Sequence, residues 1–202
     1  KYAGHFVIQV PLSTAGGGTF FVHSEDDFNA LIEARKKDIG PAFSRTQIKV
    51  TPYLEGPTLN CTGCVCNGEV ALSPPDIQIT GDSTMVSTAG QYIGSDFSHN
   101  DFGESLRSEM MDIVRRMGVW LGRNAYRGNF GIDFLTTLDS SGRVNELYVS
   151  EVNARLVGES QYMGDFEAMK GIVPLPFFHL AEYLELDVSP EEIRKYNESL
   201  PD

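Results

Sequence analysis

Residues 146–160, ELYVSEVNARLVGES, combine the apolar residues of a packed strand with polar residues at a regular spacing. Glu151, Asn153 and Arg155 stand two positions apart, and a strand places every second side chain on the same face. An acid, an amide and a guanidinium therefore share one face of an otherwise apolar strand. We interpret this face as a ligand-binding surface; the alternative is a sheet face open to water, where these residues are only solvated.

The segment GIDFL at 131–135 provides a partner for this strand. Its alternation separates Ile132 and Phe134 from Asp133, and the turn DSSGR lies between the two segments. If they pair as a hairpin, Asp133 and Glu151 meet on one polar side. Two carboxylates and an amide oxygen suit Mg²⁺, a hard cation that keeps waters and is completed by phosphates. A neighbouring arginine can brace a phosphoryl group, so the hairpin predicts a metal–phosphate site.

Composition limits the possible classes of protein. The 202 residues allow one large domain or two small ones, and the sequence shows no membrane-spanning apolar run and no signal-peptide pattern. A net charge of -12 argues against a nucleic-acid partner, because binding a polyphosphate requires clustered Lys and Arg. The chain begins at Lys1 without an initiator Met, so we expect a fragment of a longer protein.

Three cysteines lie close together in NCTGCVCNGEV, residues 60–70. A zinc site would need a fourth ligand, and the four histidines show no paired spacing. We favour a strand that leads into an Asn67-Gly68 hairpin turn, with Cys61, Cys64 and Cys66 as packing residues; zinc is the alternative. Free thiols this close together suit a reducing cytosol, so we expect a cytoplasmic protein.

The first part of the chain is predicted as strand, glycine loop, strand, helix and strand. Apolar runs predict strands at 5–10 and 19–22 and a third at 47–54 that Pro52 interrupts, while Ser24 opens a helix with a capping-box pattern. Further along, 73–81 is predicted as an edge or irregular strand, and 81–98 as a polar loop.

The longest predicted helix covers about 101–122, with Asp101 and Glu104 capping its start. Two short helices follow in the tail, one through 177–184 and one from Ser189, with Pro190 in first position and Glu192 completing a capping box. Strands and helices are segregated rather than alternating, which predicts an α+β fold with a mostly antiparallel sheet. The expected buried stripe of the long helix consists of Phe102, Leu106, Met110, Ile113, Met117, Trp120 and Leu121.

The glycine-rich stretch STAGGGTFFV, residues 13–22, joins two strands. A Walker loop would end in Gly-Lys-Ser/Thr and precede a helix, and a dinucleotide loop would also lead into a helix, so both are excluded. Backbone N–H groups and hydroxyls of such a hairpin could close over phosphates; a plain flexible turn is the alternative. The residues concerned are Ser13, Thr14, Gly16, Gly17, Gly18 and Thr19.

This glycine hairpin, TPYLEG at 51–56, YRGNFGIDFL at 126–135 and EVNARLVGES at 151–160 occur in an order that resembles the ATP-grasp superfamily. The similarity is to its carboxylate–amine ligases and the related biotin carboxylases. It covers about residues 5 to 160, and GIDFL with EVNAR is its most specific element. It implies two α+β subdomains with mostly antiparallel sheets that grip a nucleotide. Residues 1–56 would form part of the first, with the glycine-rich loop. Residues 57–202 would form the second, with the metal–phosphate site and C-terminal helices.

The resemblance also implies roles for individual residues. ATP and Mg²⁺ (or Mn²⁺) would be the cofactors, and small-molecule carboxylate and amine compounds the substrates, joined through an acylphosphate. A missing N-terminal domain of the same protein would complete the site, and a homodimer is compatible with the family. By position, the metal ligands would be Asp133, Glu151 and Asn153, with Asn153 and Arg155 catalytic. The adenine linker would be Pro52, Tyr53, Leu54 and Glu55, and the substrate contacts Gln78, Glu159 and Ser160.

The sequence departs from the family pattern at several places. Gln9 stands where many relatives have a lysine that touches the phosphates, and a glutamine brings no charge. Thr51 replaces an acid that contacts the adenine amino group, and Thr58 takes the approximate place of a ribose-binding acid.

Three hypotheses about function remain open. The first is an ATP-dependent, ADP-forming ligase acting on amino-acid-like substrates. The second is a biotin-carboxylase-like enzyme, which the lack of basic residues after PYLEG and the small LVGES segment disfavour. The third is a nucleotide-binding remnant without catalysis, which the retained set of Asp133, Glu151, Asn153 and Arg155 disfavours.

Overall fold

The computed structural model describes residues 5–10, 18–86, 90–98 and 103–200. The chain divides into two compact units, Lys1–Glu55 with Ile79–Ile93 and Gly56–Gln78 with Gly94–Asp202. Among the described residues, no helix combines the length and the apolar character needed to cross a membrane.

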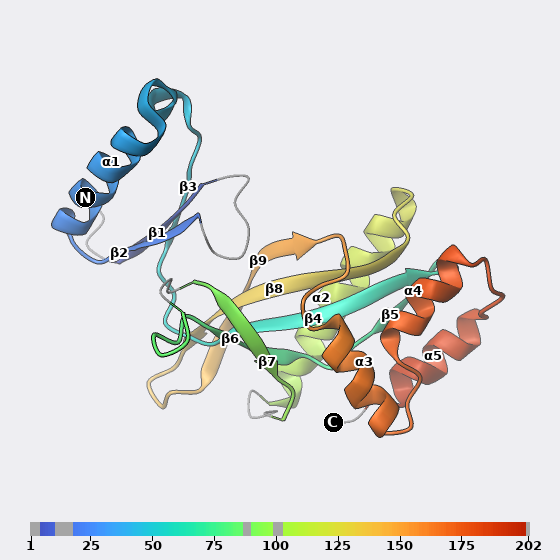
Figure 1. The fold of residues 1–202 in the computed structure, drawn as a ribbon. Coiled ribbons are helices and arrows are strands. Elements are labelled where there is room, and N and C mark those ends of the chain that lie inside the picture. The colour runs from blue at the N-terminus through green and yellow to red at the C-terminus, as the bar shows by residue number, and fades with distance from the viewer. Residues whose placement is uncertain (1–4, 11–17, 87–89, 99–102, 201–202) are drawn as a thin grey trace. The chain divides into compact units, whose positions relative to one another are not determined.

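The first unit contains a three-stranded antiparallel sheet in the order β2-β1-β3, formed by Thr19–Val22, Phe6–Gln9 and Lys49–Pro52 (Figure 1). Helix α1, Glu25–Ile39, and the 3-10 helix η1, Gly40–Arg45, connect β2 to β3. The predicted cap is present, because the Ser24 side chain accepts a hydrogen bond from the Asp27 N–H.

Helix α1 covers one face of this small sheet. The Phe28 ring of the helix lies 6.2 Å from that of Phe6, and the Arg35 guanidinium lies 5.7 Å from the centre of the Phe20 ring. Alternation along the strands places Val7 and Gln9 on the opposite face.

The larger sheet has six strands in the order β7-β6-β4-β8-β9, with β5 paired to β4, and lies mainly in the second unit (Figure 1). The pairs β4–β5, β4–β6, β4–β8 and β8–β9 are antiparallel, as predicted. The hairpin turn at Asn67-Gly68 is present, with φ of 47° and 81°. The strands are β4 Thr58–Cys66, β5 Glu69–Leu72, β6 Asp76–Thr80, β7 Tyr92–Asp96, β8 Gly128–Leu138 and β9 Val144–Asn153.

Helices cover both faces of this sheet. On one side α2, Glu104–Arg123, brings Val114 against Gly63 and Phe130. On the other side α4, Leu175–Tyr183, contacts β4, and α5, Pro190–Glu198, contacts β5. The core between these layers includes Leu59, Leu72, Met110, Phe130, Ile132 and Phe134.

Several sequence predictions need correction. The predicted loop 81–98 contains β7, and β6 lies between β7 and β4 rather than at an edge. Trp120 is 58% exposed, because the buried side of α2 runs through Met110, Val114 and Gly118. The predicted cap residue Asp101 and the predicted stripe residue Phe102 lie outside the described residues, and the helix begins at Glu104 after Gly103.

A third C-terminal helix, α3, Ser160–Met169, was not predicted. Its sequence contains a glycine and few regularly spaced apolar residues, so the helical period is weak. Packing stabilises it instead: Met163 and Glu167 are buried, and Gly164 lies close to Pro174 and Pro176.

Candidate functional site

A row of polar residues crosses four strands of the larger sheet. Asp76 on β6 lies opposite Asn60 on β4, Asn60 lies opposite Asp133 on β8, and Asp133 lies opposite Glu151 on β9. Residues directly opposite each other in antiparallel strands project from the same face. The predicted meeting of Asp133 and Glu151 therefore occurs, and two further polar residues extend it.

The Asp133 carboxylate lies at the centre of this row and accepts hydrogen bonds from three side-chain amides. Asn60 Nδ2 and Gln78 Nε2 each donate to Oδ1 at 2.8 Å, and Asn153 Nδ2 donates to Oδ2 at 3.1 Å. A carboxylate offers about four lone-pair positions, so one on Oδ2 remains for another partner. The amides fix the orientation of Asp133 and leave it able to bind a cation.

Asn153 connects this carboxylate to Arg155. The arginine Nη2 donates to Asn153 Oδ1 at 3.1 Å, and its Nη1 donates to the Leu156 carbonyl at 3.0 Å. Strand β9 ends at Asn153, so Arg155 follows the strand rather than lying on it as the sequence suggested. The side-chain contact nevertheless brings Arg155, Asn153 and Asp133 into one chain of hydrogen bonds.

The donor set fits a small hard cation. Asp133 Oδ2 and the exposed Glu151 carboxylate are the two anionic groups, and waters and phosphate oxygens usually complete such a site. Asn153 would join them only by turning its Oδ1 away from Arg155. Across the described part of the chain, no group of three or more His, Cys, Asp or Glu residues is suited to hold a metal by itself. The protein would therefore supply only part of the coordination, as is usual for Mg²⁺ with a nucleotide.

Asn60 and Asp76 belong to this site but were not predicted. Asn60 was read only as part of a strand with buried cysteines, although it alternates with Leu59 and Cys61 and so had to face the other way. Burial raises the pKa of Asp76 to about 8. A hydrogen bond with Ser95 acts to lower this pKa, and the negative charge of Glu159 acts to raise it.

The predicted substrate contacts occupy different environments. Gln78 is bonded to Asp133, as described. Glu159 is buried, and this burial raises the pKa of its carboxyl group. Ser160 is also buried, and its hydroxyl accepts a hydrogen bond from the Val157 N–H at 3.0 Å, so it stabilises the turn before α3.

The predicted phosphate-binding residues of the first unit are partly described. Gln9 ends β1 and lies opposite both Thr19 of β2 and Lys49 of β3. The Val10 N–H donates to the Gly18 carbonyl at 2.9 Å at the base of the loop. Lys49 was not predicted, yet its register places a positive charge beside the uncharged Gln9. Ser13, Thr14, Gly16 and Gly17 lie outside the described residues.

The predicted adenine linker leaves β3 at Pro52. The Tyr53 N–H donates to the His5 carbonyl at 3.1 Å, and its ring lies 5.8 Å from the rings of both Phe21 and His23. Leu54 is half-buried and Glu55 is exposed. Their contact with adenine stays a prediction.

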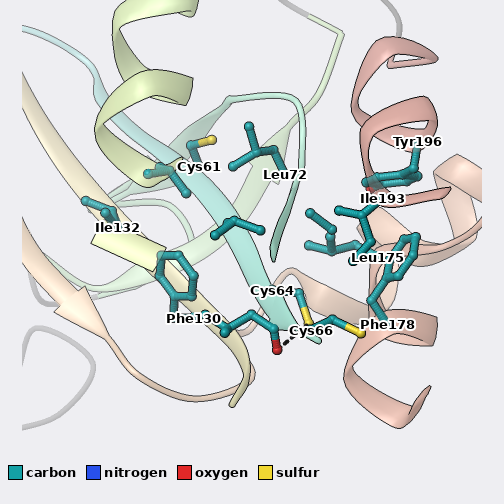
Figure 2. Close-up of a cluster of buried hydrophobic side chains, with 14 of the residues drawn as sticks. Cys61, Cys64, Cys66, Leu72, Phe130, Ile132, Leu175, Phe178, Ile193 and Tyr196 are labelled. Carbon is teal, nitrogen blue, oxygen red and sulfur yellow. Dashed lines mark hydrogen bonds between the residues drawn. The ribbon is translucent and has the colours of Figure 1, made fainter. Parts of the chain in front are cut away.

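The three cysteines are free and buried in the core, on two sides of β4. Figure 2 shows Cys64 and Cys66 near Phe178 and Cys61 away from them. Alternation along β4 directs Cys61 to the opposite face, so one zinc ion cannot bind all three. Burial raises the pKa of Cys66 to about 11 and also raises the pKa of the other two thiols, which disfavours reactive thiolates.

Comparison with known proteins gives the context for this geometry. No protein-family model matches the chain. A 95-residue segment is 33% identical to L-propargylglycine–L-glutamate ligase from Streptantibioticus cattleyicolor, covering 47% of this chain and 18% of the ligase.

Solved structures match over most of the chain. Biotin carboxylase from Campylobacter jejuni aligns with a TM-score of 0.65, 16% identity and coverage of 93% of this chain and 38% of that one. Carboxyaminoimidazole ribonucleotide synthase from Aspergillus clavatus, complexed with ATP, aligns with a TM-score of 0.62 and 14% identity, covering 93% of this chain and 43% of that one. D-alanyl-alanine synthetase A from Vibrio cholerae aligns with a TM-score of 0.51 and 22% identity, covering 74% of this chain and 42% of that one.

The chain thus spans less than half the length of each of these proteins. The shared architecture confirms the α+β prediction and the mostly antiparallel sheets expected of an ATP-grasp fold. The chain has the ATP-grasp fold, like the carboxylate–amine ligases and biotin carboxylases that its sequence resembles.

Proposed function

We propose that this chain forms part of an ATP-dependent ligase that joins a carboxylate to an amine and releases ADP. The observation that carries the proposal is the Asp133–Glu151 pair across β8 and β9, linked through Asn153 to Arg155. The ATP-grasp fold and the partial identity to an amino-acid ligase support it.

The residues of the second unit fit the phosphate end of a nucleotide. Asp133 and Glu151 would hold Mg²⁺, or Mn²⁺, which when bound neutralises phosphate charge. Arg155 is exposed and retains guanidinium donors beyond the two that contact Asn153 and Leu156. It would steady the transferred phosphoryl group, a role that a planar guanidinium performs well.

The reaction proposed needs no protein nucleophile. A substrate carboxylate oxygen attacks the γ-phosphorus of ATP, the bond to the β-phosphate oxygen breaks, and ADP leaves. The amine nitrogen then attacks the acyl carbon, loses a proton and displaces phosphate. Positioning and charge stabilisation account for the catalysis of such steps. The buried, high-pKa cysteines agree with the absence of covalent catalysis through a thiol.

The first unit would contribute the other nucleotide contacts. Gln9, Thr19 and the glycine-rich loop are proposed to bind phosphates, and residues 52–55 to contact the adenine. We also propose that the chain forms two ATP-grasp subdomains, residues 1–56 and residues 57–202. In this division the segment Ile79–Ile93 would be part of the second subdomain by sequence, although it groups with the first compact unit.

Calorimetric titration of ATP and ADP, with and without Mg²⁺, tests the proposal on this chain. We expect Mg²⁺-dependent binding that Glu151→Gln weakens about tenfold or more, equivalent to about 1.4 kcal/mol. Glu146→Gln is the matched control, because Glu146 is an exposed carboxylate on the same strand that accepts a bond from Thr137.

Each outcome has a clear reading. No Mg²⁺-dependent binding, or equal losses in the two variants, would overturn the proposed site. Binding lost only in Glu151→Gln would justify screening pairs of amino acids for ADP release by a longer form of the protein. Binding without release from any pair would favour the non-catalytic alternative.

A further inference from the structure

Two histidines of the first unit meet at the open end of the hairpin that carries the glycine-rich loop. His5 directly precedes β1, and His23 directly follows β2. The register pairs Phe6 with Val22, so one further step along both strands brings His5 opposite His23. Their ring centres lie 4.7 Å apart, and the ring planes meet at 89°. The spacing of the histidines in the sequence gives no sign of this pair, because the two residues approach each other only when the strands pair.

Both imidazole rings are accessible to an ion from solution. His5 and His23 are exposed. Their hydrogen bonds to other described residues use backbone atoms: the His23 N–H donates to Asp27 Oδ2 at 3.0 Å, and the His5 carbonyl accepts from the Tyr53 N–H at 3.1 Å. The ring nitrogens therefore have no hydrogen-bond partner among the residues that the structure describes. A neutral imidazole has one nitrogen with a lone pair that can bind a metal.

The separation of the two rings fits two ligands on one metal ion. Zinc binds imidazole nitrogen at about 2.0–2.1 Å, so two imidazoles on one tetrahedral zinc have ring centres about 5 Å apart. The 4.7 Å between the rings of His5 and His23 is close to this value. Rotation about the side-chain torsions would direct one nitrogen of each ring at a shared ion. No movement of the strands is needed, because directly opposite residues already have Cβ atoms about 4.5–5.5 Å apart.

Neighbouring side chains hold the pair in place. The Tyr53 ring lies 5.8 Å from the ring of His23 and 6.4 Å from that of His5, so both imidazoles pack beside the same aromatic side chain. This packing reduces the conformational freedom that the two rings would lose on binding an ion. The Asp27 carboxylate, which accepts the His23 N–H, places a negative charge near a position suited to a cation.

The ligand type selects the class of ion. Imidazole nitrogen suits zinc, copper and nickel, whereas Mg²⁺ prefers oxygen ligands and water. Among the described residues, no group of three or more His, Cys, Asp or Glu could hold a metal. The protein would therefore supply two ligands here, and water would fill the remaining positions of the ion. None of the residues proposed to bind Mg²⁺ in the second unit takes part in this pair.

We propose that His5 and His23 bind one divalent transition-metal ion of the zinc type and thereby join the start of β1 to the end of β2. Such a link closes the segment between the two histidines, which includes the glycine-rich loop. Closing a loop with a metal removes conformational freedom from the unpaired chain, so the ion stabilises the paired hairpin. The inference goes beyond the proposed ligase function and does not depend on it.

Nuclear magnetic resonance titration of the untagged chain with zinc chloride tests the site, with magnesium chloride as the matched probe. We expect the ring carbon-bound proton signals of His5 and His23 to shift together and to saturate at one zinc ion per chain, with no response to magnesium. His5→Gln and His23→Gln should each weaken zinc binding about tenfold or more, because the remaining imidazole loses a partner held at high effective concentration. His179→Gln makes the same change in the second unit, where Nδ1 already accepts the Asn129 N–H, and should have no effect.

The titration has clear contrary outcomes. Unchanged zinc affinity in His5→Gln or His23→Gln would overturn the site, as would equal responses to zinc and magnesium or an equal loss in His179→Gln. Amide spectra of the zinc-free variants report whether the first unit folds, and Trp120 fluorescence reports the second. Zinc should also slow amide hydrogen exchange in β1 and β2 of the wild-type chain. Unchanged exchange at saturating zinc would refute the stabilising link between the strands.

Discussion

The close approach of α2 to β5 at Gly118 leads to a quantitative prediction about stability. A methyl group on Gly118 would lie 2.7 Å from both γ-carbons of Val70 and 3.0 Å from Phe130 Cζ. Val70 and Phe130 are buried, so neither side chain can move into solvent. The same methyl on Gly122, one turn later in α2, would approach only Val65 Cγ1, at 3.2 Å.

The two positions differ in packing but not in helix propensity. Replacing glycine by alanine inside a helix gains about 1 kcal/mol at either site. Overpacking of a core costs about 1–3 kcal/mol, and the three short contacts at Gly118 indicate the upper part of that range. Gly118→Ala should therefore destabilise the second unit by about 1–2 kcal/mol, whereas Gly122→Ala should be neutral or slightly stabilising.

Urea unfolding followed by fluorescence measures this difference. Trp120 is the single tryptophan of the chain and lies in α2, so its signal reports the second unit. Thermal unfolding should show a decrease in Tm of about 2–4 °C per kcal/mol. In a Val70→Ala background the Gly118→Ala penalty should largely disappear, which a double-mutant cycle detects as a coupling energy. Equal stability of Gly118→Ala and Gly122→Ala would refute the argument that this contact limits how closely α2 can pack.

Three further predictions concern charge and capping. Lys49→Gln should weaken binding of ATP with Mg²⁺ by about threefold to tenfold by calorimetry, as expected for one exposed charge near a phosphate. A compensating Gln9→Lys should restore it, since the two residues are directly opposite; unchanged affinity in Lys49→Gln would remove it from the phosphate site. Because the pKa of Asp76 rises to about 8 on folding, the native state binds its proton more tightly than the unfolded state. Stability should then decrease as pH rises from about 4 to 8, and Asp76→Asn should flatten that part of the urea-unfolding profile. Ser189→Ala removes the capping box that Ser189 forms with Glu192 and should cost about 1 kcal/mol in thermal unfolding; no loss would mean that packing alone holds α5.

Local patterns in the sequence were sufficient for the elements whose stabilising contacts are close in the chain. The Ser24 and Ser189 caps and the Asn67-Gly68 turn depend on neighbours within a few residues, and all three are present. The pairing of Asp133 with Glu151 was also predictable, because a short hairpin turn and a period of two fix which side chains share a face.

Other features depend on partners that are distant in the sequence. Asn60 and Gln78 reach Asp133 from 73 and 55 residues away, and only the strand order β6-β4-β8 brings them together. Helix α3 has a weak period and forms where buried Met163 and the close approach of Gly164 to prolines stabilise it.

By itself, the sequence determined the hairpin, its polar face and the resemblance to ATP-grasp enzymes, since alternation and turn chemistry act over short distances. Tertiary structure alone decided that Asp133 is held by three amides and that Asp76 and Glu159 are buried. Burial and strand order arise when distant segments pack together, and no local period encodes which strand becomes the neighbour of another.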